Sequence, residues 1–339
     1  MIVGQAGIVG QERAVEQLLA AWASKRMHHA WLLTGPRGLG KASIAEAAAK
    51  RMLAEAAGPP PGGAGLEVDD QHPTARLLAA GSHPDYRKLE RLERPTGGLA
   101  RNIAVDQVRG LGEMLSMTPS MSPWRVIVID AADDLESEAA NALLKMLEEP
   151  PASTLFLLVS HNPGRLLPTI RSRCRRLDFA ALDDDAMTSL LSDWFRDKNS
   201  DEIATLVAAG GGSPGKAQKA ATLDLPALER DARAIMADGD SDNRRRSALA
   251  QMLGLKGAGD RYAAFLGLVP ALIARETRHF NGNRRQRALD AYERARDTAA
   301  VAPRLSLDPA MTVFQLGSIL ASLALTASLA LTGSVSLKD

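Results

Sequence analysis

A glycine-rich loop between two apolar segments constrains the fold of this chain more than any other feature. The run His29-Ala30-Trp31-Leu32-Leu33 predicts a short buried strand, and the sequence from Lys41 onward has the period of a helix. Between them lies Gly35-Pro36-Arg37-Gly38-Leu39-Gly40-Lys41. In this order, strand, loop and helix form a phosphate-binding unit, because glycines let backbone N–H groups approach phosphate oxygens. The alternative is a glycine-rich turn that holds no ligand.

Two further apolar runs extend this unit into an expected parallel sheet. Val126–Ile129 is followed by Asp130, and Leu155–Val159 is followed by polar residues that begin at Ser160. The segment between the runs is helical in period and ends before Pro150-Pro151. We therefore expect an α/β P-loop core over residues 1–179, interrupted by a loop at residues 58–66.

Beyond residue 179 the sequence predicts helices without strands. Residues 180–222 begin with three aspartates and close around a glycine-rich stretch, which predicts a small helical lid domain. Residues 223–339 predict an all-α C-terminal collar domain with breaks at 253–260 and 302–309. A last helix at about 311–332 carries no charge, and small polar residues recur along it. That stripe favours a packed bundle or oligomerisation helix; a membrane span is the alternative.

Composition narrows the classes of protein that are compatible with this chain of 339 residues. The formal net charge is +1, so no whole-molecule field attracts nucleic acid or an anionic membrane. The single cysteine, Cys174, rules out an internal disulfide and a cysteine-rich zinc site. The N-terminus lacks the pattern of a secretory signal, and we expect a cytoplasmic protein.

The loop predicts a nucleotide site with incomplete catalytic chemistry. We expect ATP or ADP to be held by Gly35–Lys41, with Lys41 reaching the terminal phosphates. The next position, which normally supplies a hydroxyl ligand to Mg²⁺, is Ala42. Asp130 is the candidate for supporting the metal at a strand end, but it is followed by Ala131 instead of a carboxylate. Mg²⁺ is therefore expected to be held weakly, and hydrolysis to be lost.

Several distinct motifs then occur in one order. They are IVGQ at 8–11, HHAWLLTGPRGLGK at 28–41, GSHPDYRKLER at 81–91, NALLKMLEEPP at 141–151, SHNP at 160–163 and IRSRCRRL at 170–177. Together they resemble the bacterial clamp-loader branch of the AAA+ ATPases over roughly the first 220 residues. The resemblance implies a hetero-pentamer with gamma/tau and delta subunits, which places a sliding clamp on primed DNA. It also implies a component of the replicative polymerase that has no polymerase activity of its own.

The same resemblance assigns a role to one arginine. In that family the Arg of the Ser-Arg-Cys motif, here Arg173, acts in the ATP site of the neighbouring subunit. The alternative is a surface arginine in an ion pair. Two departures separate this chain from the family's motor subunit: Gly215 stands where a nucleotide-sensing arginine is usual, and residues 58–82 lack the cysteines of a zinc module. No zinc is expected.

Three functions follow as hypotheses. The first is a non-hydrolysing assembly subunit of the clamp loader, which the missing groups favour. The second is the ATP-hydrolysing motor subunit, which the intact loop favours. The third is a free-standing AAA+ nucleotide switch or helicase loader. Weaker candidates have plainer interpretations. Glu148-Glu149 is expected to be a helix end, with a carboxylate pair as the alternative, and His28-His29 are expected to be packing residues, with metal ligands as the alternative. Arg244-Arg245-Arg246 is expected to be a solvated helix end, with a phosphate contact as the alternative.

Overall fold

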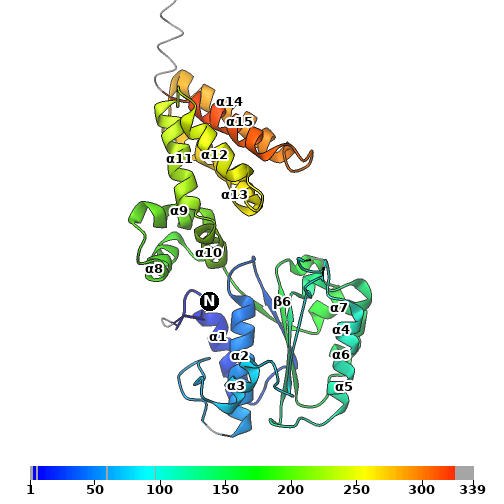
Figure 1. Ribbon diagram of the computed structural model, residues 1–339. Helices are drawn as coiled ribbons and strands as arrows, with labels where there is room; N and C mark the ends of the chain where they lie inside the picture. The colour runs from blue at the N-terminus through cyan, green and yellow to red at the C-terminus, as the bar shows by residue number, and fades with distance from the viewer. Residues whose placement is uncertain (1–2, 5–6, 59, 96, 325–339) are drawn as a thin grey trace, which may run out of the picture. The chain divides into compact units, whose positions relative to one another are not determined.

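The computed structural model of the protein describes residues 3–4, 7–58, 60–95 and 97–324 (Figure 1). Contacts divide the chain into two compact units. The first holds the described residues up to Leu190 together with Gly211–Lys216, and the second holds Leu191–Gly210 and the described residues from Ala217 onward. The boundary falls within helices α8 (Asp184–Trp194) and α10 (Pro214–Thr222). The division into three domains at residues 179 and 222 stays a prediction.

A parallel five-stranded sheet forms the centre of the first unit. Its strands lie in the order β4-β5-β6-β3-β7, and every neighbouring pair is parallel. The strands are β3 (Ala30–Thr34), β4 (Tyr86–Glu90), β5 (Arg125–Asp130), β6 (Thr154–Ser160) and β7 (Arg175–Asp178). A separate hairpin pairs β1 (Val3–Gly4) with β2 (Gly7–Ile8). Because the strands are parallel, the residues that follow β3, β5 and β6 meet at one edge of the sheet.

Helices cover both faces of the sheet, as Figure 1 shows. They are α1 (Glu12–Ala23), α2 (Lys41–Ala57), α3 (Pro73–Ala79), α4 (Val105–Arg109), α5 (Leu111–Ser116), α6 (Ser137–Glu148) and α7 (Pro168–Ser172). Trp31 and Leu33 of β3 pack with α1 and α2 in one core cluster. Ala30 and Leu32, which alternate with them, pack with α4 to α7 in the other. Both faces of β3 are buried, which explains its unbroken apolar run.

The expected α/β core is confirmed, with two additional strands. β4 and β7 were not predicted because they lie at the edges of the sheet and carry charged residues, as in Arg175-Arg176-Leu177-Asp178. The hydrophobic period of residues 12–28 predicts a longer first helix, but α1 ends at Ala23, and Lys25 follows with a φ of 55°. The expected loop after α2 is present in the described residues of 58–66.

The second unit is a helical bundle. Its helices are α9 (Ser200–Gly210), most of α10, α11 (Leu225–Asp238), α12 (Arg244–Gly254), α13 (Gly259–Thr277), α14 (Gly282–Val301) and α15 (Pro309–Ala321). The expected breaks at 253–260 and 302–309 are present, and further breaks follow Asp238 and Thr277. The all-helical character of the C-terminal region is confirmed.

Helix α15 is an internal element of this bundle. It contacts α11, α12, α13 and α14, and its Leu316 and Leu320 are completely buried. The helix ends at Ala321, and residues 325–332 of the expected longer helix lie outside the described residues. Within the described part of the chain, no helix is both long and apolar enough to cross a membrane.

One serine of α15, Ser318, contacts an arginine of α12. Arg246, at the start of α12, donates to the Ser318 hydroxyl at 3.0 Å and to the Asp240 carboxylate at 3.0 Å. A Cβ at Gly317 would lie 2.7 Å from the Arg246 side chain, so glycine makes room for it. The interpretation of Arg244-Arg245-Arg246 as solvated was therefore wrong for Arg246, whose side chain is 12% exposed.

Candidate functional site

The glycine-rich loop joins β3 to α2 at the carboxyl edge of the sheet. Gly35 and Gly38 have φ angles of 144° and 81°, in the region that favours glycine. A Cβ at Gly35 would lie 2.3 Å from the Phe179 carbonyl oxygen. Gly40 precedes the first helical residue with a φ of 80°, so the loop feeds directly into the N-terminus of α2. A helix of 17 residues directed at the loop supplies the partial positive charge that favours phosphate.

Lys41 is buried and turned back onto the loop. Its Nζ donates to the carbonyl oxygens of Gly35 at 2.6 Å and Pro36 at 2.5 Å. Burial lowers its pKa to about 8, although the nearby Asp133 and Asp130 carboxylates oppose that shift. The ammonium group is therefore placed where a phosphate would be received, and it must exchange its carbonyl partners to contact one.

Asp133 organises the end of the neighbouring strand β6. It lies in a short 3-10 helix, Ala132–Asp134, and its carboxylate accepts from the Ser160 hydroxyl at 2.7 Å and from the Asn162 backbone N–H at 3.2 Å. The His161 backbone N–H donates to the same carboxylate. Asp133 lies just beyond Asp130, the last residue of β5. Its proximity to Ser160-His161-Asn162 depends on the pairing of β5 with β6, which one sequence does not reveal.

A cavity of about 600 Å³ adjoins the loop. Arg37 lines it from the loop, Asp130 and Ala131 from the end of β5, and His161 from the end of β6. Burial raises the pKa of Asp130, whereas burial and then the charges of Lys41 and Arg37 lower the pKa of His161 to about 4. His161 is thus neutral at pH 7. Its buried Nδ1 has no hydrogen-bond partner within the described residues, so the site offers an unused polar atom.

The structure brings the predicted loop and Asp130 to one edge, but it supplies few groups for a metal. Ala42 is partly buried and packs against the apolar core, so no hydroxyl follows Lys41. Ala131 is buried and apolar at the end of β5. Among the described residues no group of three or more His, Cys, Asp or Glu side chains is placed to hold a metal ion. These residues fit a phosphate better than a magnesium nucleotide.

A segment from far along the chain packs against the loop. The Ser213 hydroxyl donates to the Arg37 carbonyl at 2.9 Å, and the Gly215 backbone N–H donates to the Gly38 carbonyl at 2.9 Å. A Cβ at Gly215 would lie 2.9 Å from the Gly38 Cα. The glycine that replaces the expected sensing arginine therefore allows the start of α10 to approach the loop backbone closely. The sequence showed the substitution but not this contact.

We expect Gly38→Ala to loosen this contact. The new methyl group would lie 2.3 Å from the Ser213 hydroxyl and would add a left-handed backbone penalty of about 1–2 kcal/mol. The free energy of unfolding should fall by more than in Gly65→Ala, because Gly65 also has a positive φ but no atom within 4 Å of its added Cβ. Urea unfolding of the two variants measures the difference; equal losses would show that the Ser213 contact is unimportant.

Arg173 lies on the same unit, in the turn that ends α7. Its guanidinium forms an ion pair with Glu148 at 2.8 Å and donates to the Thr169 carbonyl at 3.1 Å, with 36% of the side chain exposed. Cys174 packs beside it against the apolar core, and burial raises its pKa to about 12. Cys174 is therefore a packing thiol. The ion pair that was expected of a surface arginine is present; the role of Arg173 in a neighbouring site stays a prediction.

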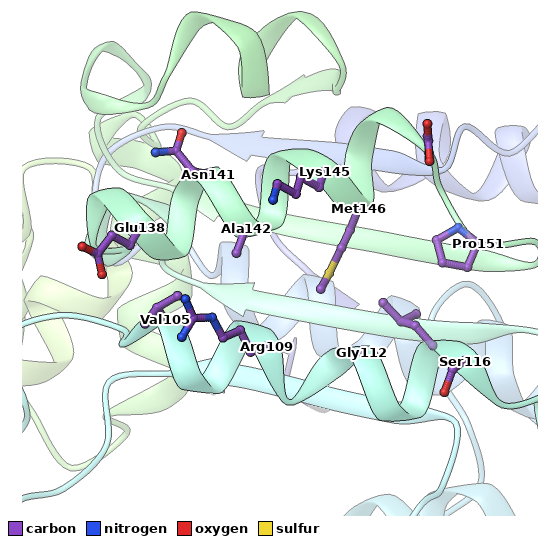
Figure 2. Close-up of a pocket in the computed structure, with 12 residues that line it drawn as sticks. Val105, Arg109, Gly112, Ser116, Glu138, Asn141, Ala142, Lys145, Met146 and Pro151 are labelled. Carbon is purple, nitrogen blue, oxygen red and sulfur yellow. The ribbon is translucent and has the colours of Figure 1, made fainter.

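A second groove lies on the helical face formed by α4, α5 and α6 (Figure 2). Its volume is about 720 Å³, with Val105, Leu115 and Met146 among its apolar lining residues. Arg109 and Lys145 line it together with Glu138 and Glu149, so its charges are balanced. In Figure 2, Ala142 and Met146 of α6 point toward α4 and α5.

Comparison with known proteins places these features in a family. A sequence model of the family described as DNA polymerase III, delta subunit, matches residues 10–183, just over half of the chain. The chain belongs to this family. The match includes the glycine-rich loop, Asp130 and the Ser172-Arg173-Cys174 turn, and it ends as α8 begins.

Three relatives illustrate the family. The chain is 40% identical to DNA polymerase III subunit delta' of Pseudomonas aeruginosa over 56% of this chain and 55% of that protein. It is 35% identical to subunit delta' of Haemophilus influenzae over 55% and 53%. It is 32% identical to subunit tau of Bacillus subtilis over 55% and 30%. The matched part thus spans about half the length of the delta' relatives.

Proposed function

We propose that this chain is a non-hydrolysing subunit of a bacterial DNA polymerase III clamp loader, in the role that the name delta' denotes. In this proposal it joins gamma/tau and delta subunits in a cytoplasmic hetero-pentamer that loads a sliding clamp onto primed DNA. Its contribution to catalysis is Arg173, which acts in the ATP site of an adjacent subunit. Its own loop retains phosphate contacts without the groups for hydrolysis.

One observation carries the proposal: a partly exposed arginine is held on the outside of a unit whose own nucleotide site is incomplete. Arg173 is accessible to a neighbouring chain, whereas Lys41 is buried and bonded to its own loop. Ala42 and Ala131 provide neither a magnesium ligand nor a carboxylate to polarise water. Arg173 is therefore better placed to act in the ATP site of another subunit than at the loop of its own chain.

The motor-subunit alternative has less support from the site. A hydrolysing subunit needs the hydroxyl, the carboxylate and the sensing arginine that Ala42, Ala131 and Gly215 replace. The 32% identity to a tau subunit reflects the shared core and does not restore these groups. A free-standing switch would not use an exposed Ser-Arg-Cys turn, because such an arginine acts only beside a neighbour.

We expect the isolated chain to hydrolyse ATP at no more than background rate. Lys41→Ala should leave that rate unchanged, because no turnover depends on Lys41 when Ala42 and Ala131 stand beside it. Restoring Thr at position 42 and Glu at position 131 should still give little activity without a neighbour's arginine. Phosphate release by the purified chain measures this. Robust turnover that disappears in Lys41→Ala would favour the motor-subunit alternative.

A further inference from the structure

Glu148 ties the end of helix α6 to the Ser-Arg-Cys turn. Its Oε1 lies 2.8 Å from a terminal guanidinium nitrogen of Arg173, and the other terminal nitrogen donates to the Thr169 carbonyl at 3.1 Å. The Ser172 hydroxyl donates to that same carbonyl at 3.0 Å. The guanidinium is thus fixed at two points, one on α6 and one on α7, which define the direction of its plane.

These contacts leave the guanidinium able to bind an anion. Arginine has five N–H donors, and the two contacts use one hydrogen on each terminal nitrogen. Each of those nitrogens keeps a second hydrogen, and Nε keeps its own. With 36% of the Arg173 side chain exposed, the remaining donors are accessible from solvent. The ion pair therefore orients the arginine without blocking it.

The two neighbouring glutamates at the end of α6, Glu148 and Glu149, have different contacts. Glu149 lines the groove of Figure 2 with Glu138, Ala142 and Lys145. Glu148, the last residue of α6, is absent from the lining of that groove and forms its ion pair with Arg173, in the turn after α7. Within the described residues Glu149 has no ion pair with an arginine or lysine, so neighbouring glutamates of equal charge have different surroundings.

We propose that Glu148 is a positioning residue for Arg173, holding the guanidinium in the orientation that it needs in the neighbouring subunit's ATP site. The proposal rests on the proposed function. Without Glu148, the long Arg173 side chain would sample more rotamers. The entropy cost of ordering it would then offset part of the free energy of its interaction with phosphate. Because Arg173 acts on charge that develops during phosphoryl transfer, losing its orientation should lower kcat and leave the KM for ATP unchanged.

The size of the effect follows from the exposure of the pair. Partly exposed ion pairs contribute at most about fivefold in an equilibrium, so Glu148→Ala should reduce turnover at the neighbouring site about two- to fivefold. Glu148→Gln keeps an oxygen acceptor and loses the charge, so its turnover rate should lie between those of wild type and Glu148→Ala. High salt should make the turnover rates of wild type and Glu148→Ala similar, because screening weakens the ion pair between Glu148 and Arg173. A purely packing role would not respond to salt in this way.

The test uses the full chain reconstituted with its partner subunits, clamp and primed DNA. The partners carry alanine at their own loop lysines except at the site beside this chain, so that one site is measured. Glu148→Ala, Glu148→Gln and Arg173→Ala are compared with Glu149→Ala, the matched control, at low and high salt. We expect normal turnover in Glu149→Ala, a salt-sensitive loss of kcat in Glu148→Ala and silence in Arg173→Ala.

Two results would overturn the inference while leaving the proposed function intact: wild-type turnover in Glu148→Ala, or equal losses in Glu148→Ala and Glu149→Ala, with Arg173→Ala silent in both cases. Wild-type turnover in Arg173→Ala would instead overturn the proposed function itself. If Glu148→Ala fails to assemble, Glu148→Gln decides, because its side chain has the same size and retains an acceptor. A loss of kcat in Glu148→Gln supports the inference, and wild-type kcat there overturns it.

Discussion

Replacing Arg173 by alanine should silence one ATP site of the assembled clamp loader, in the subunit next to this chain. A guanidinium that reaches the transferred phosphoryl group stabilises the charge that develops there, which contributes about 10³–10⁵ in rate. Lysine should not restore the activity, because a single ammonium on a flexible stem does not reproduce the planar donor set of arginine. Turnover counted per site, with clamp and primed DNA present, measures the loss.

Folding and assembly should survive this substitution. Arg173 is partly exposed, and its ion pair with Glu148 is of a kind that contributes about 1 kcal/mol or less. Arg171, two residues earlier, is the matched control: it is also exposed, and among the described residues its guanidinium donates only to the Pro163 carbonyl, at 3.4 Å. Arg171→Ala should leave turnover unchanged. If every site fires at the wild-type rate in Arg173→Ala, Arg173 is only a surface arginine.

Strong local patterns made much of the fold predictable. The unbroken apolar run of β3 and the glycine-rich loop that follows it were enough to predict, from residue order alone, a buried parallel strand that leads through the loop into a helix. The edge strands β4 and β7 were missed because one-sided burial leaves charged residues in them, such as Lys88 and Arg175. Their assignment to the sheet depends on pairing with distant strands, which local periodicity does not report.

The candidate site, like the fold, was predictable only in part. The loop, Asp130 and Arg173 were identified from residue types in fixed order along the chain. The bonds that hold them were not: Asp133 to the end of β6, Ser213 to the loop and Glu148 to Arg173 join residues that lie far apart in the sequence. Single residues of common types at such separations carry no local signal. Glu148 was correctly predicted to lie at a helix end, yet the same residue also forms an ion pair with Arg173.

In the second unit, replacing Asp240 by alanine should be the most destabilising change among the charged residues of α12 and the turn before it. Asp240 accepts from the backbone N–H groups of Arg245 at 3.1 Å and Arg246 at 3.0 Å, as well as from the Arg246 guanidinium. Its side chain is 2% exposed. Removing the carboxylate would leave a buried arginine without its counter-ion, which typically costs about 3–5 kcal/mol. Hydrogen exchange of α12 and α15 in the full chain measures the local free energy of opening.

The contribution of the Asp240 carboxylate to stability should depend on pH. Burial alone raises the pKa of Asp240, but hydrogen bonds from the Arg246 and Arg245 backbone and the Arg246 guanidinium outweigh it, so the net pKa is lowered. A carboxyl with a lowered folded-state pKa stabilises the protein above its unfolded pKa, near 4, and loses that contribution as pH falls through the folded value. The difference in free energy of unfolding between wild type and Asp240→Asn should therefore shrink below about pH 4.

Asp242→Ala, which removes an exposed partner of Arg244, is the control for Asp240→Ala and should cost about 1 kcal/mol or less. Equal exchange rates in Asp240→Ala and Asp242→Ala would mean that the contact of Arg246 with Ser318 and Phe314 holds α12 to α15 without help from Asp240.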